Sequence, residues 1–263
     1  MNGTKVQQKS IVLRLFLRYV LEIAYNGTDF HGWQSQLNNI TVQEVIEQHL
    51  SILLKSKISV MGCGRTDAGV HALQFFLHFD FNESLPVGSL FRLNQMLPKS
   101  IAIKQVLSVN DHFHARFSAL SRTYLYKATT LKNPFMEFQS LFLYKKPDLI
   151  LMNQGCIELL KHNDFASFCK RGADNKTTLC DLMEANWTYQ DGNFEFRVKA
   201  NRFLRNMVRA LVGTLLELGY GSISIEEFQN IIMNKERSRA GKSVSPVGLY
   251  LSEIEYNWDE YRS

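Results

Sequence analysis

Segments with strand-like and helix-like periodicity alternate along almost the whole sequence, and this order constrains the fold more than any other feature of the chain. In the first half, strands are expected over residues 16–26, 58–63, 70–81 and 101–109. Helices are expected after Thr41 and over residues 88–97. In the second half, strands are expected over residues 123–130, 180–190, 193–200 and 248–256, and helices over residues 148–162, 202–218 and 225–234. Each half therefore mixes strands with helices in a similar order.

Local signals mark several ends of these elements. Thr41 followed by Glu44 is typical of a capping box, and Asn26-Gly27 and Asp191-Gly192 are typical of tight turns because both dipeptides accept positive φ. Hairpins favour antiparallel pairing over a doubly wound parallel sheet. We therefore expect an α+β fold of two related halves, with mostly antiparallel sheets flanked by helices. The expected division is an N-terminal tail over 1–14, an N-terminal half over 15–110 and a C-terminal half over 111–263.

Composition narrows the class of protein. The 263 residues allow one large domain or two modest ones, and 30 Lys and Arg against 25 Asp and Glu give a net charge of +5. This mild basic excess permits a polyanionic partner without demanding one. The cysteines show no Cys-x-x-Cys spacing, and Arg14 and Arg18 interrupt the apolar run near the N-terminus. We expect reduced thiols, no membrane-spanning segment and a cytoplasmic protein.

The loop between the expected strands 58–63 and 70–81 is the most unusual segment. Its three glycines bracket the charged triplet that holds Arg65 and Asp67, and such a loop lets backbone approach a ligand closely. A guanidinium beside Asp67 would keep its carboxylate ionised as a nucleophile or base. From spacing alone, a surface turn with an ion pair is an equally good interpretation.

Three arginines follow the expected strand 193–200. Arg202, Arg205 and Arg209 would share one face of the helix expected over 202–218, opposite an apolar stripe. With no acidic partner one turn away, this face suits phosphate binding, although an ordinary solvated face fits the spacing equally well.

Aromatic and basic residues interleave over 112–127. Arg116, Phe117, Arg122 and Tyr124 belong to this segment, and aromatic rings that stack on bases beside arginines that hold phosphates are typical of a single-strand RNA surface. Alternation along a strand would place Tyr124 and Tyr126 on the same face, so that one of them could be plain core.

The sequence lacks recognisable cradles for common cofactors. It has neither the Gly-x-x-x-x-Gly-Lys-[Ser/Thr] phosphate loop nor Gly-x-Gly-x-x-Gly after a strand, so the simplest expectation is a reaction without a cofactor. His112 and His114 have no further Cys or His nearby at metal-ligand spacing, and we expect no metal site. These two histidines, like His71 and His78, are interpreted as polar loop residues.

Five blocks of sequence, in the same order along the chain, resemble the tRNA pseudouridine synthases of the TruA type. They are Tyr25-Asn26-Gly27-Thr28-Asp29-Phe30-His31-Gly32-Trp33-Gln34, Gly64-Arg65-Thr66-Asp67-Ala68-Gly69-Val70-His71-Ala72, Phe113-His114-Ala115-Arg116-Phe117-Ser118-Ala119 with Arg122-Thr123-Tyr124, Asn201-Arg202-Phe203-Leu204-Arg205-Asn206-Met207-Val208-Arg209 with Val212-Gly213, and Gly248-Leu249-Tyr250-Leu251. The blocks span about residues 19 to 256, and an accidental match of five is far less probable than a match of one. Ser245-Pro246-Val247 departs from the pattern, where smaller residues are more usual before the glycine.

The resemblance implies a pseudouridine-synthase-like fold with a central cleft, and the isomerisation of uridine to pseudouridine at positions 38, 39 and 40 in the anticodon stem-loop of tRNA. It implies no metal or organic cofactor, and a homodimer that binds tRNA. Asp67 would be the nucleophile, Arg209 would pair with it, and Tyr124 would stack on the flipped uracil. Arg65 would help to fill the vacated stack, and the other expected substrate-binding residues are Arg116, Arg202, Arg205 and Leu249.

Two other classes of function remain open from the residues. Cys63 could be the nucleophile of a cysteine-dependent RNA-modifying enzyme, although a cysteine at a strand end is often simply a small buried residue. The basic cleft could also belong to a non-catalytic module that binds or folds tRNA, in which Asp67 would be dispensable.

Overall fold

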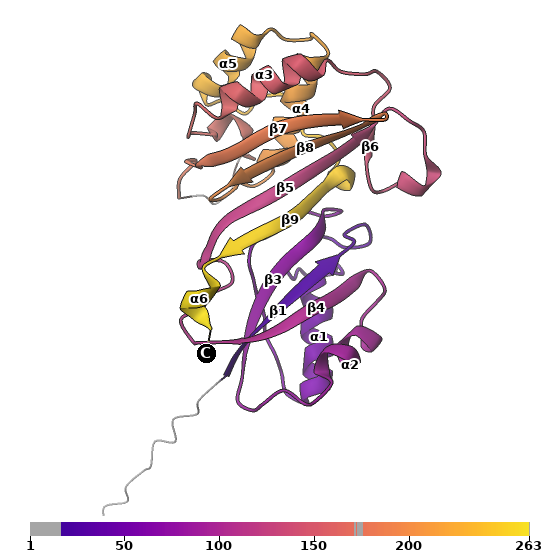
Figure 1. Cartoon of the computed structure of the whole chain (residues 1–263), viewed down its shortest axis with the longest axis vertical. Coiled ribbons are helices and arrows are strands. Elements are labelled where there is room, and N and C mark those ends of the chain that lie inside the picture. Colours follow the sequence, from indigo (N-terminus) through magenta and orange to yellow (C-terminus); the bar gives the residue numbers. More distant parts are fainter. Residues whose placement is uncertain (1–16, 171, 173–175, 263) are drawn as a thin grey trace, which may run out of the picture.

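The computed structural model describes residues 17–170, 172 and 176–262, so the tail expected over residues 1–14 lies outside the described residues. The described strands form one continuous sheet that runs the length of the molecule (Figure 1), in the order β4-β1-β3-β9-β5-β8-β7, with β2 beside β3 and β6 beside β5. Their bounds are β1 Leu17–Tyr25, β2 Met61–Gly62, β3 His71–Phe81, β4 Ile101–Val109, β5 Ala119–Thr129, β6 Leu141–Phe142, β7 Leu182–Gln190, β8 Asn193–Ala200 and β9 Leu249–Tyr256.

Pairing in this sheet is antiparallel except where β3 meets β9 and where β5 meets β6. The mostly antiparallel α+β fold expected from the sequence is thus confirmed. The strands of both halves join in one sheet, because the C-terminal strand β9 lies between β3 of the first half and β5 of the second.

Helices cover both ends of the sheet. Figure 1 shows α1 and α2 packed at one end and α3, α4 and α5 at the other. Their bounds are α1 Val42–Leu54, α2 Ser89–Met96, α3 Leu149–Leu159, α4 Met207–Gly219, α5 Ile225–Asn234 and the short α6 Trp258–Tyr261. Within the described part of the chain, none of these helices is long and apolar enough to cross a lipid bilayer.

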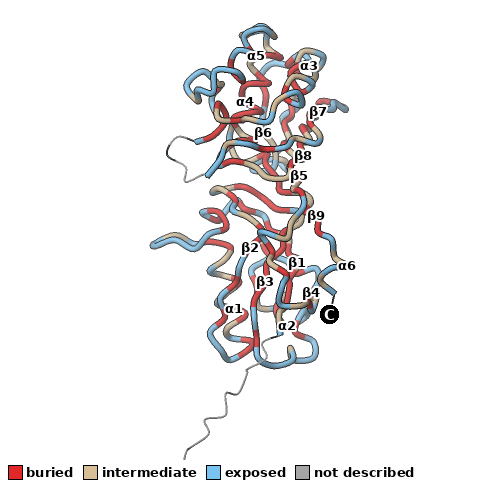
Figure 2. The backbone as a smooth tube through the Cα atoms, turned by 90° about the vertical axis from the view of Figure 1, so that its left-hand side faces the viewer, coloured by how far each residue is buried: buried red, intermediate tan, exposed pale blue. Residues whose placement is uncertain are grey.

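Two hydrophobic cores lie side by side along the sheet. The first joins β1, β3 and α1 through residues such as Ile23, Ile46 and Phe75, and β9 adds Leu251 to it. The second joins β8 and α4 through residues that include Phe196 and Leu211. Figure 2 shows these buried stretches in both halves, with α1 and α4 on the same side of the strands.

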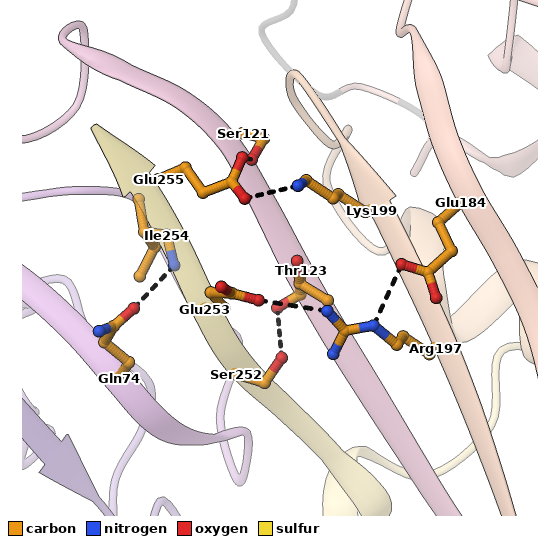
Figure 3. A network of polar contacts seen from close by, with 10 residues as sticks. All are labelled: Gln74, Ser121, Thr123, Glu184, Arg197, Lys199, Ser252, Glu253, Ile254 and Glu255. Carbon is orange, nitrogen blue, oxygen red and sulfur yellow. Dashed lines mark hydrogen bonds and ion pairs between the residues drawn. The ribbon is translucent and has the colours of Figure 1, made fainter. Parts of the chain in front are cut away.

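The seam between the halves is short. Only two residue pairs, His71 with Tyr250 and Ala72 with Leu251, make the ladder between β3 and β9. Gln74 lengthens it with its side chain, since its Oε1 accepts a hydrogen bond of 2.9 Å from the backbone N–H of Ile254 (Figure 3). The backbone pairing between the two halves is therefore confined to a few residues at the start of β3.

A charged network on the sheet ties β9 to the strands beyond it (Figure 3). Buried Phe196 and Val198 alternate along β8 with Arg197 and Lys199, which therefore point to the opposite face. Lys199 Nζ lies 2.6 Å from a carboxylate oxygen of Glu255, and Arg197 bridges Glu184 at 3.1 Å and Glu253 at 3.2 Å. Both cations reach across β5, so the network joins four neighbouring strands.

Two expected elements differ from the sequence-based boundaries. The strand expected over 58–63 pairs only at Met61–Gly62, because side chains of α1 bind the backbone of the residues before it: the N–H of Val60 donates to Glu47 at 2.9 Å. The helix expected over 202–218 begins at Met207, since Asn206 has a φ of 67°, in the left-handed region that an α-helix excludes.

Candidate active site

The loop between β2 and β3 is built to hold its backbone against the segment 25–33. A Cβ on Gly62 would come within 2.8 Å of the Trp33 ring, so only glycine fits there. The N–H of Trp33 donates to the carbonyl of Thr66 at 3.2 Å, and the N–H of Gly69 donates to that of Phe30 at 3.2 Å. These contacts fix the backbone on both sides of Asp67.

Asp67 meets Arg209 across the two halves of the fold. The guanidinium Nη1 of Arg209, in the first turn of α4, lies 3.5 Å from Asp67 Oδ2, and 34% of the aspartate side chain is exposed. Arg209 is oriented by Val244: its Nε donates to the Val244 carbonyl at 2.7 Å, and its own carbonyl accepts from the Val244 N–H at 3.2 Å. The structure thus presents an oriented ion pair with a carboxylate that solvent can reach.

A pocket of about 630 Å³ opens over this pair. Asp67 is its carboxylate, while the cationic side chains that line it are those of Lys170, Arg205, Arg209 and Arg237. Ser243 accepts hydrogen bonds from Asn206 at 2.6 Å and Arg237 at 2.8 Å, which fixes the far wall. A pocket with one carboxylate under several cations suits a phosphate-bearing substrate that reacts at the carboxylate.

Tyr124 lies half-buried on β5, in contact with both cores. Its ring meets that of Phe203 edge-on, with the centroids 5.0 Å apart. Burial raises the pKa of the Tyr124 hydroxyl, and the nearby charges of Arg122 and Asp67 act on it in opposite directions. The hydroxyl is therefore protonated at neutral pH and lies within electrostatic range of Asp67.

The other arginines expected at the site fall in different places. Arg202 and Arg205 precede α4, so the shared helical face with Arg209 is wrong. Arg205 is exposed and lines the pocket. Arg202 is not part of the pocket lining, and its Nη1 donates to the Thr177 carbonyl at 3.4 Å. Arg65 is exposed, and the guanidinium found beside Asp67 is that of Arg209.

Two expected substrate-binding residues lie away from the pocket lining. Arg116 is exposed, with its guanidinium 5.5 Å from the centroid of the Phe117 ring. Leu249 is 6% exposed and packs in the second core, where it pairs with Tyr126 across β5 and β9. Their binding roles stay predictions.

Arg122 corrects the interpretation of the aromatic and basic segment. Its guanidinium donates to four backbone carbonyls, including that of Cys63 at 3.2 Å and that of Asn201 at 2.9 Å. These bonds join the strand before Asp67 to the segment before α4. Arg122 therefore holds together segments next to the site, and four of its five donors are used for contacts within the protein.

We interpreted His71 and His78 from the sequence as polar loop residues, and this interpretation is wrong. Both lie in β3, where they are 3% and 7% exposed. The sequence pattern did not identify them as buried, because a histidine whose ring nitrogens bind backbone can occupy a buried strand position as an apolar residue does: both nitrogens of His71 have such partners, and Nδ1 of His78 accepts from the Ala115 N–H.

Cys63 is a poor candidate nucleophile in this structure. It is 1% exposed, and burial raises the pKa of its thiol to about 12. Thiolate is the reactive form, and it is scarce at neutral pH for such a group. The geometry thus favours Asp67, whose carboxylate faces the pocket, over the cysteine-dependent alternative.

Lys170, Arg237 and Ser243 were not identified from the sequence. They come from two segments without a helical or strand pattern, Lys170 from the one before β7 and the other two from the one after α5, and they reach the pocket only through the packing of α4. The one available signal was the cluster of basic and hydroxyl residues over 235–245, which is also typical of an ordinary surface loop.

Comparison with known proteins gives one consistent family. A family model described as tRNA pseudouridine synthase matches residues 156–257. A tRNA pseudouridine synthase A from Parabacteroides distasonis is 45% identical over 246 residues, covering 91% of this chain and 96% of that protein. Proteins of the same name from Azobacteroides pseudotrichonymphae and Bacteroides fragilis are 46% and 43% identical, covering 92% and 91% of this chain and 98% and 96% of their own lengths. The resemblance seen in the sequence is confirmed, and the chain belongs to the tRNA pseudouridine synthase family of isomerases.

Proposed function

We propose that this enzyme converts uridine to pseudouridine at positions 38, 39 and 40 in the anticodon stem-loop of tRNA, with Asp67 as its nucleophile. The observation that carries the proposal is the solvent-accessible Asp67 carboxylate, held 3.5 Å from Arg209 in a pocket lined by cations. The positions in tRNA follow from the motifs shared with the TruA type, and the geometry supports the role of Asp67.

The reaction is an isomerisation that needs no external electrons or group donor. The bond between uracil N1 and the sugar C1′ breaks, a bond between C5 and C1′ forms, C5 loses its hydrogen and N1 gains one. An ionised carboxylate can promote these bond changes by attacking the sugar or the base, by removing a sugar proton, or by stabilising the detached intermediate. Arg209 orients the Asp67 carboxylate, because it contacts both that carboxylate and the backbone of Val244.

The uridine must leave its stack to reach Asp67, because a base within a helical stem is inaccessible to a side chain in a pocket. Tyr124 provides an aromatic ring on the strand next to the site, and its protonated hydroxyl lies within range of Asp67. Arg65 is exposed at the same loop and is available to take the place of the flipped base. We assign stacking to Tyr124 and support of the vacated stack to Arg65.

Phosphate binding is assigned to the cations around the pocket. Lys170, Arg205 and Arg237 lie beyond Arg209 on the pocket wall, where they would neutralise the backbone on either side of the flipped nucleotide. A mild net charge of +5 is compatible with this role because the cations are concentrated at the site. We further propose that the enzyme acts as a homodimer in the cytoplasm, which would place two such surfaces in one electrostatic field.

The test is to map pseudouridine in an unmodified tRNA transcript that carries uridine at 38, 39 and 40, after incubation with the purified enzyme. Matched transcripts replace each uridine in turn with cytidine, which has no pseudouridine product. The proposal predicts modification at these positions and its loss at each replaced one. Pseudouridine only elsewhere in the tRNA, or none with bound tRNA and folded enzyme, would contradict it.

A further inference from the structure

His71 lies at the point where the two halves of the fold meet. It is the first residue of β3 and follows Asp67 by four positions. Its backbone pairs with Tyr250 of β9, and its ring stacks on the Tyr250 ring with the centroids 4.6 Å apart and the planes at 22°. The buried ring therefore contacts both the N-terminal half and the C-terminal strand, and its backbone directly follows residues 63–70, the loop with Asp67 that we call the catalytic loop.

Both ring nitrogens of His71 bind backbone from different segments. The N–H of Gly27 lies 3.1 Å from Nδ1, and the carbonyl of Val247 lies 3.1 Å from Nε2. A backbone N–H can only donate, so Nδ1 must be the unprotonated acceptor, and Nε2 then carries the proton and donates to Val247. The two partners thus define one neutral tautomer.

The Val247 contact leads back to the ion pair. Residues 244–248 form a short segment. In it, the carbonyl of Val244 accepts from the Arg209 side chain, the N–H of Val244 donates to the Arg209 backbone, and Val247 accepts from His71. Pro246, between them, lies against the catalytic loop, since a Cβ on Gly69 would be 3.1 Å from Pro246 Cγ. Besides their direct ion pair, Asp67 and Arg209 are therefore also connected through His71 and the 244–248 segment.

We propose that His71 is a positioning residue that, as the neutral Nε2–H tautomer, sets the distance between the Asp67 carboxylate and the Arg209 guanidinium by anchoring the 244–248 segment to the catalytic loop. This inference rests on the proposed function of the Asp67 site. It assigns to His71 no contact with the substrate.

The electrostatic surroundings agree with a neutral ring. The titratable side chains that face it in the described structure are Tyr250 from β9 and Lys127 from β5, whose Nζ lies 4.8 Å from the centroid of the Tyr250 ring. Burial lowers the pKa of His71, the backbone contacts with Val247 and Phe138 act in the opposite direction, and Lys127 lowers it further, so that the pKa lies below its usual value. A proton on Nδ1 would also face the Gly27 N–H, so that two donors would oppose each other.

The test uses three substitutions that separate the two hydrogen bonds. His71→Phe keeps the ring stack and removes both bonds; His71→Asn retains an acceptor near the place of Nδ1; His71→Gln retains a donor near the place of Nε2. We expect His71→Phe to lower the single-turnover rate by about 10²-fold, because a misplacement of about 1 Å costs this much. The dissociation constant for tRNA should stay within about twofold, since the pocket cations come from other segments.

The comparison of His71→Gln with His71→Asn distinguishes a positioning role of His71 from an effect on the stability of the fold. His71→Gln should retain more activity than His71→Asn, because it keeps the bond to Val247. His78→Phe is the matched control: His78 is also buried in β3 and accepts from a backbone N–H, that of Ala115 at 3.2 Å, but it contacts a different segment. This control should lower the melting temperature without the change in rate.

Nitrogen NMR of the imidazole supplies a readout that needs no substrate. The wild-type enzyme should show His71 with Nδ1 unprotonated and Nε2 protonated at neutral pH. The opposite tautomer, a His71→Phe rate equal to wild type, or more activity in His71→Asn than in His71→Gln would overturn the inference. An inactive wild-type enzyme that shows the expected tautomer would instead count against the proposed function.

Discussion

Arg209→Lys tests how much of the site depends on a guanidinium rather than on a positive charge. In the structure Arg209 uses Nη1 toward Asp67 at 3.5 Å and Nε toward Val244 at 2.7 Å. A lysine nitrogen cannot occupy both positions at once, so the variant keeps the charge but loses either the orientation or the ion pair.

The size of the effect follows from the two contacts. Side-chain exposures of 21% for Arg209 and 34% for Asp67 place the pair between surface and interior. An exposed pair contributes about 0.2–1 kcal/mol, and a hydrogen bond from a charged donor contributes about 1.5–3 kcal/mol. Losing the hydrogen bond and part of the pair should therefore raise the barrier by about 2–3 kcal/mol, a fall in rate of about 30- to 150-fold.

The assay is single-turnover formation of pseudouridine with enzyme in excess over tRNA, which separates chemistry from binding and product release. Arg197→Lys is the matched control, because Arg197 also bridges two groups, Glu184 and Glu253, on the opposite face of the sheet. It should retain the wild-type rate to within about twofold. An Arg209→Lys rate equal to that of this control would refute the orienting role of the guanidinium.

Three further predictions concern neighbouring groups. Tyr124→Phe should bind tRNA with unchanged affinity and lose most of its turnover, because the ring remains while the hydroxyl is lost; equal turnover would exclude a catalytic hydroxyl. Cys63→Ala should keep the rate within about twofold, because the buried thiol has a pKa of about 12; a folded but inactive variant would restore the cysteine mechanism. Burial, with Arg18 and His114, lowers the pKa of His78 from 6.5 to about 4. Between these values the unfolded chain binds a proton that the native state excludes, so the free energy of unfolding should fall by at most about 3 kcal/mol as the pH drops from 6.5 to 4. Urea titrations across this range should show a flatter dependence for His78→Phe.

Local signals in the sequence predicted most of the elements. The Asp191-Gly192 dipeptide does join β7 and β8, with φ of 48° and 81°, and the Thr41 side chain accepts a hydrogen bond from the N–H of Glu44 at the start of α1. The start of α4 was placed too early because Leu204 is buried although it lies outside the helix, so it continued the apolar stripe. Periodicity reports burial, and here a buried loop residue imitated a helical one.

Contacts between distant segments were beyond local patterns. No spacing rule places β9 between β3 and β5 or brings Arg209 to Asp67, and only the resemblance to a family predicted that pair. Lys170, Arg237 and the role of Arg122 emerged from packing alone. Spacing indicated that Arg65 could pair with Asp67, but the arginine that meets the carboxylate comes from the other half of the chain.

The most direct test of the central claim is release of tritium from tRNA labelled at uridine C5, measured for the wild-type enzyme and for Asp67→Asn. C5 must lose its hydrogen when it becomes the glycosidic carbon, so release reports the isomerisation itself. The account predicts release by the wild-type enzyme and none above background by Asp67→Asn, with tRNA binding and melting temperature preserved. Release at the wild-type rate by Asp67→Asn would contradict it.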